Sequence, residues 1–173
     1  IGGFTLGSLS KTDDTTYTAT FTVAEGGTDV AAGSDIPVSI VMADPAGSPS
    51  NTYTTAISQA SDLIDANSPT VAAVSIADAA MNVGDTVTAT ITVSGAAGET
   101  LSLTSGTIGG FTLGSLIKAT DTTYVASFTV SEGGTDVAAG SDIPVSIVMA
   151  DPAGNPSNTY TTAISQASDA IDA

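Results

Sequence analysis

An internal duplication constrains the fold more than any other feature of this sequence. Residues 1–66 align with residues 108–173 without a gap, and only eight of these 66 positions differ. The repeating unit is therefore 107 residues long, which is close to the usual size of one domain. Residues 67–173 hold one whole unit, whereas residues 1–66 hold the last part of another unit without its first 41 residues. We expect the chain to be a slice of a longer tandem array.

Short runs of the sequence alternate between apolar and polar residues, a period of two that indicates strands rather than helices. In residues 86–93, TVTATITV, the apolar side chains fall on one face and four threonines on the other. The same alternation recurs in 122–130, 143–149 and 158–165. Further strands are expected at 70–77, 100–104 and 110–117, which makes about seven strands in one unit.

Turn-forming sequences separate the predicted strands, namely NVGD, GAAGE, SEGGTDVAAGSD and DPAGNPSN. Seven short alternating strands at this spacing predict an all-β fold, with immunoglobulin-like β-sandwich repeats arranged in tandem. The chain has no cysteine, so the disulfide of antibody domains is missing. A helix is the alternative for ISQASDLIDA (57–66), but its apolar residues are too few for a stable helical stripe.

The charge of the chain restricts its partners. It carries 18 acidic residues, two lysines, no arginine and no histidine, for a net charge of −16. Such a chain repels nucleic-acid phosphates and anionic membranes and attracts cations. It has no apolar run of the roughly 18 residues that a membrane span needs. The charge therefore predicts no nucleic-acid partner and no membrane partner. Without histidine or cysteine the usual nucleophile–base pairs are missing, and nothing in the sequence pairs the carboxylates in an apolar cleft for glycoside hydrolysis, so we expect no enzyme.

Acidic residues near the start of the complete unit form a candidate metal site. In an immunoglobulin-like sandwich, the start of the first strand shares a pole with the second–third and sixth–seventh strand loops. Hard divalent cations prefer about six to eight oxygen ligands from carboxylates, amides and carbonyls. We predict that calcium binds at the junction DLIDANSP (62–69) and these two loops, through Asp62, Asp65, Asn67, Glu99, Asp151 and Asn155. The alternative is a set of unconnected, solvated carboxylates.

A second acidic group lies in loops of the opposite pole, and its function is open between two roles. These residues could add metal ligands from a preceding domain, or they could keep the surface soluble: Asp78, Asp85, Glu132, Asp136 and Asp142, with Glu25, Asp29 and Asp35 in the first copy.

The threonine row at 86–92 has two interpretations as well. It could bind ice or sugar, but threonine is also a common outward residue of half-buried strands, and we favour this second interpretation.

The order of segments resembles a known family. The complete unit opens with SPTVAAVSIAD and continues through GDTVTATITVSG, LTSGTIGGFTLGSL, DTTYVASFTV and VMADPAGNPSN. This order resembles the bacterial Ig-like domains that are repeated many times in giant biofilm and RTX-type surface adhesins. The loop from Asp151 to Asn155 is the most specific element, and the first copy departs from it with Ser48 in place of the asparagine.

The resemblance implies an extender on the bacterial cell surface, outside the cell. Such domains project a terminal ligand-binding module, contact neighbouring repeats of the same polypeptide, and many bind calcium at or near domain junctions. Two other functions remain open. One is an adhesion module that binds carbohydrate or protein, and the other is a self-assembling filament subunit that exchanges strands with other copies.

The incomplete first copy raises a packing problem. Without equivalents of the first three strands, inward side chains such as Phe4, Tyr17 and Phe21 would lose their cover, at a cost of roughly 1.5–3 kcal/mol each. We therefore expect residues 1–66 not to form a closed domain alone. Another chain could supply the strands by donor-strand addition. Residues 67–107 could instead fold back onto 1–66 as a circular permutant, but the short linker favours packing on 108–173.

Overall fold

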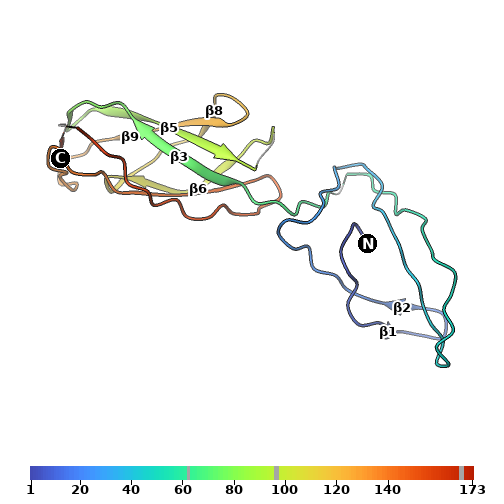
Figure 1. Cartoon of the computed structure of the whole chain (residues 1–173). Helices are drawn as coiled ribbons and strands as arrows, with labels where there is room; N and C mark the ends of the chain where they lie inside the picture. The colour runs from blue at the N-terminus through green and yellow to red at the C-terminus, as the bar shows by residue number, and fades with distance from the viewer. Residues whose placement is uncertain (62, 96–97, 168–169) are drawn as a thin grey trace. The chain divides into compact units, whose positions relative to one another are not determined.

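The computed structural model describes residues 1–61, 63–95, 98–167 and 170–173 (Figure 1). The chain divides into two compact units, Ile1–Asn67 and Ser68–Ala173. The described residues form strands, turns and irregular segments without any helix, which confirms the all-β class. The helical alternative is wrong for the described part of residues 57–66. Among the described residues, therefore, no helix is long and apolar enough to cross a membrane.

The first sheet of the 68–173 unit has β5 and β9 at its centre. Its strands are antiparallel and follow the order β3 (Thr70–Ile76), β5 (Thr86–Ser94), β9 (Thr123–Thr129) and β8 (Ile117–Lys118). Every second residue of β5 is buried, from Val87 to Val93, whereas the threonines between them are exposed or half-buried. The alternation seen in the sequence thus marks the inward face of this strand.

The second sheet of this unit has the order β10 (Val145–Ala150), β6 (Ser102–Ile108) and β7 (Phe111–Thr112). The segment 156–164 runs along the edge of β10 that faces away from β6. It makes three separate antiparallel bridges there: Ile143 to Ile164, Ile147 to Tyr160 and Ala150 to Pro156. The predicted strand 158–165 exists only as these bridges. Two short strands form an additional parallel pair, β4 (Met81–Asn82) with β11 (Ile171–Asp172).

The predicted strand 110–117 is wrong as a single strand, because the chain changes sheets within it. Its beginning, β7, pairs with β6, whereas β8 near its end pairs with β9 of the other sheet. Between them the Gly114 N–H donates to the Ser127 carbonyl at 2.8 Å. One segment therefore links the two sheets.

One hydrophobic core joins the two sheets into a sandwich-like unit. The rings of Phe111 and Phe128 stack with centroids 5.7 Å apart, one from each sheet. Ile91 and Met149, on β5 and β10, are fully buried in the same core. Strands from 68–107 pair with strands from 108–173, because β5 pairs with β9 and β6 pairs with β10. The circular permutation is therefore absent from this structure.

The 1–67 unit repeats the second half of this architecture without the first. It holds one short hairpin, β1 (Ser10–Lys11) with β2 (Tyr17–Thr18). Its other ladder contacts are separate bridges equivalent to those of the second copy: Val30 to Ile64, Ile36 to Ile57, Ile40 to Tyr53 and Ala43 to Pro49. Its core is small, with Val30, Ile36 and Ile64 packed against Ile1 and Phe4.

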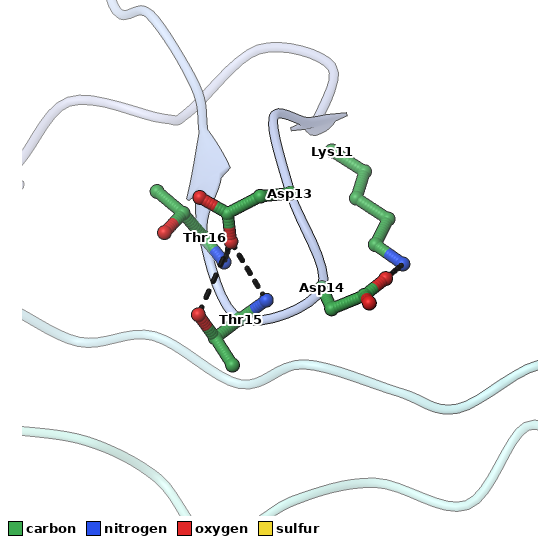
Figure 2. A network of polar contacts seen from close by, with 5 residues as sticks. All are labelled: Lys11, Asp13, Asp14, Thr15 and Thr16. Carbon is green, nitrogen blue, oxygen red and sulfur yellow. Dashed lines mark hydrogen bonds and ion pairs between the residues drawn. The ribbon is translucent and has the colours of Figure 1, made fainter.

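The turn between β1 and β2 is held by Asp13, as Figure 2 shows. One Asp13 carboxylate oxygen accepts the Thr15 N–H and the Thr16 N–H, each at 2.8 Å, and the Thr15 hydroxyl at 3.1 Å. These hydrogen bonds, led by the one from the Thr15 backbone, lower the pKa of Asp13 below its ordinary value of 3.8. Lys11 pairs with Asp14 at 2.9 Å on the same exposed turn. The hairpin is thus stabilised locally, without a neighbouring strand.

Candidate metal centre

Asp151 follows directly after β10 and is held by its own turn. Its two carboxylate oxygens accept hydrogen bonds from Asn155, from the backbone N–H at 2.8 Å and from the side-chain Nδ2 at 3.0 Å. The Gly154 N–H donates to the Asp151 carbonyl at 3.2 Å, and Gly154 has a φ of 94°, which favours glycine. The DPAGN sequence therefore fixes the orientation of one buried carboxylate.

Glu99 lies in the loop between β5 and β6, and two side chains of the first sheet pin this loop. The buried Tyr124 of β9 donates its hydroxyl hydrogen to the Glu99 carbonyl at 2.7 Å and accepts the Leu101 N–H at 3.1 Å. Lys118 of β8 donates to the Gly98 carbonyl at 2.9 Å. The backbone on both sides of Glu99 is therefore anchored to the sandwich.

Together, these two elements bring the Glu99 and Asp151 carboxylates close to each other. Each offers an oxygen within 4.8 Å of the other, and both residues belong to the 68–173 unit. Two carboxylates at this distance repel each other unless a cation lies between them. This pair could hold a metal ion.

Four further residues were predicted as ligands: Asp62, Asp65, Asn67 and Asn155. Asp62 lies outside the described residues. Asp65 accepts the Asn67 N–H at 3.3 Å. The Asn67 Nδ2 donates to Asp29 at 2.8 Å and to the Gly27 carbonyl at 3.3 Å, all within the 1–67 unit. Asn155 orients the Asp151 carboxylate, and a direct metal bond from its side chain stays a prediction.

Three members of the second acidic group accept hydrogen bonds from backbone N–H groups, a role that the sequence analysis missed. Asp29 accepts the Ala66 N–H at 2.8 Å, and its counterpart Asp136 accepts the Ala173 N–H at 2.9 Å. Asp85 accepts the Asn82 N–H at 2.8 Å. The first two bonds join residues 37 positions apart, so no local pattern could signal them. A metal role for Asp78, Glu132 and Asp142, which are exposed, stays a prediction.

Comparisons with protein-family models, with curated proteins and with solved structures find no match to this chain. The features that bear on function are therefore the duplication, the two-sheet unit and the Glu99–Asp151 pair.

Proposed function

We propose that this chain is a structural extender: a series of Ig-like repeats in a long protein on the outside of a bacterial cell, stiffened by calcium at the junctions between repeats. The near-exact duplication carries the proposal, since only eight of 66 aligned positions differ. A binding site needs one good copy, whereas a spacer gains length from each further copy. No catalytic role is proposed.

The order of the strands supports an Ig-like topology. In such sandwiches, the first, second, fifth and fourth strands form one sheet, and the third, sixth and seventh form the other. If the two-residue strands β4 and β7 are left out of the count, the order β3, β5, β9 and β8 corresponds to the first sheet. The second sheet then contains β6 and β10, with the bridged segment 156–164 as the seventh strand.

Asp65 is the proposed third carboxylate of the metal site. The Ser68 carbonyl lies close to Gly95: its oxygen is 3.2 Å from the position that a Cβ atom would take on this glycine. Gly95 begins the loop that carries Glu99, so the chain enters the 68–173 unit beside this loop. Three peptide units join Asp65 to Ser68, which limits their Cα atoms to a separation of about 11 Å. The covalent chain therefore keeps Asp65 near the pole where Glu99 and Asp151 meet.

The chemistry of these groups favours calcium. All the proposed ligands are oxygen atoms, and the chain contains no cysteine or histidine for a softer metal. Calcium accepts about six to eight oxygens in flexible geometry, which suits ligands from three separate segments. Magnesium demands near-ideal octahedral geometry, which such a site is less able to supply.

The complete unit offers little support for the carbohydrate-binding alternative. Aromatic side chains are enriched at binding interfaces, so exposed rings would favour this alternative. In residues 68–173 three of the four aromatic side chains are buried and the fourth is half-buried: Phe111, Tyr124, Phe128 and Tyr160. These rings stabilise the core instead.

Small-angle X-ray scattering on two complete repeats in series tests the proposal. In calcium we expect an elongated particle whose length approaches that of two domains end to end. With a chelator we expect the same two domains with a wider distribution of distances, because the junction carboxylates then repel each other. A compact particle in calcium would contradict the extender function. Identical profiles in both conditions would contradict the calcium site alone.

A further inference from the structure

The 1–67 unit exposes apolar side chains whose counterparts are buried in the second copy. Tyr17 is 44% exposed and Met42 is 38% exposed, whereas Tyr124 and Met149 are 1% and 0% exposed. In the 1–67 unit these two residues help to line an open groove of about 630 Å³, with Ile1, Leu6, Leu9 and Ile40. The groove is apolar because its residues match residues that form the hydrophobic core of the second copy.

In the second copy, residues 68–107 cover the equivalent surface. β5 places Ile91 opposite Tyr124 and Ala89 opposite Ala126, and β6 places Leu103 opposite Met149. The buried side chains of β9, Tyr124, Ala126 and Phe128, are the same in both copies. On β9 the two substitutions, Val125 for Thr18 and Ser127 for Thr20, alternate with the buried residues and lie on the outer face.

We propose that the open face of the 1–67 unit is a docking surface for an additional chain segment with the sequence of residues 68–107. This segment adds strands equivalent to β3, β5 and β6, and it closes the unit as a sandwich like that of residues 68–173. The surface is complementary because the same side chains already accept the same segment once in this molecule.

The chain's own 68–107 segment cannot reach this surface. In the complete unit the repeat ends at β11, which pairs with β4 beyond the last residue of β3. The repeat begins at Thr70, at the other end of β3. A seven-residue strand spans about 20 Å, whereas the four steps from Ala66 to Thr70 span at most about 14 Å. The end of the 1–67 unit and the start of a β3 strand packed on that unit would therefore be too far apart for this linker.

A second copy of the whole chain is a poor occupant as well. Each chain has one 68–107 segment and two surfaces that accept it, 1–67 and 108–173. Exchange of this segment between two chains would uncover one surface for each surface that it covers. The buried apolar area would not increase, so an additional copy of the segment, rather than one exchanged between two chains, is the occupant that lowers the free energy.

The test adds a synthetic peptide of residues 68–107 to the full chain and measures amide hydrogen exchange. We expect saturable binding at one peptide per chain and slower exchange in residues 17–24 and 38–43, by about tenfold or more. The peptide with Ile91→Asp should not slow exchange. Met42→Asp in the chain should abolish binding, whereas the matched variant Met42→Leu should keep it. If the peptide is insoluble, coexpression of the segment with the full chain provides the complex, and copurification replaces titration.

Three results would overturn the proposal. Unchanged exchange in residues 17–24 at saturating peptide would show that the surface does not accept the segment. Altered exchange confined to residues 124–131 would show replacement of strands in the second copy instead. Dimerisation of the full chain without peptide, with residues 17–24 protected, would identify a second copy as the occupant.

Discussion

The two copies of the repeated segment have nearly the same sequence and equivalent bridges, but they differ in the strands that they form. Residues 123–129 form a seven-residue strand, β9, whereas the equivalent part of the first copy contains only the two residues of β2. Residues 145–150 form β10, whereas their counterparts make isolated bridges only. The difference is the presence of β5 and β6 beside the second copy. Strand formation here depends on the neighbouring strand more than on local preference.

The largest expected effect comes from shortening Met149, and its counterpart Met42 in the first copy provides the comparison. Met149→Ala removes a fully buried side chain and should destabilise the 68–173 unit by about 2–5 kcal/mol. Met42→Ala shortens a side chain that is already partly in solvent, so the free energy of unfolding should change by only about 0.5 kcal/mol. Urea denaturation followed by circular dichroism measures both. Equal losses would show that the first copy is packed as tightly as the second.

Calcium should distinguish Asp151 from Asp44, because among the described residues Asp151 belongs to a group of carboxylates that could hold a metal ion and Asp44 does not. At a calcium concentration 100 times the dissociation constant, binding to the folded state adds about 2.7 kcal/mol to the stability of the 68–173 unit. Asp151→Ala should remove most of this gain, and Asp44→Ala should leave it intact. Calorimetric melting curves in calcium and in chelator provide the measurement. If the wild-type curves coincide, no calcium binds.

The two tyrosines give a smaller contrast. Tyr124→Phe leaves the Leu101 N–H and the Glu99 carbonyl without their buried partner, which should cost about 1–3 kcal/mol. It should also weaken calcium binding, because the Glu99 loop loses an anchor. Tyr17→Phe should be nearly neutral. A loss of stability from Tyr17→Phe comparable to that from Tyr124→Phe would contradict the difference in packing.

The smallest effect concerns the turn of the first hairpin. The pKa of Asp13 is lowered by its hydrogen bonds, so its stabilising effect is complete above pH 3.8 and is lost as the pH falls through the lowered value. The second copy has Thr120 at this position and should show no such titration. Amide chemical shifts of Thr15 and Thr16 between pH 5 and pH 2 report the transition, and Asp13→Ala is the control. A midpoint above 3.8 would show that these hydrogen bonds do not form in solution.

The sequence predicted those strands whose apolar residues alternate over many positions. β5, β9 and β10 lie within or close to their expected ranges, and every second residue of each is buried. β3 also lies within its expected range, although a register shift between Val71 and Ala73 interrupts its alternation. The pair of β4 and β11 was missed, since two-residue strands have no detectable period. The change of sheet between β7 and β8 was also missed, because alternation does not indicate which strand will be the neighbour.

The candidate site was only partly predictable for a similar reason. The acidic loops indicated carboxylates near the end of β10 and before β6, and the structure brings Glu99 and Asp151 together there. The anchoring of Glu99 through Tyr124 joins residues 25 positions apart. Neither alternation nor turn chemistry contains information on such a contact, so only the folded structure reveals it.

Amide hydrogen exchange on the intact chain tests most directly whether the neighbouring strands decide the structure of each copy. Peptides 17–24, YTATFTVA, and 124–131, YVASFTVS, differ at three positions, so mass spectrometry separates them. We predict exchange in 124–131 that is slower than in 17–24 by on the order of 100-fold or more, since core strands open only with the whole unit. Equal protection of the two peptides would contradict this account.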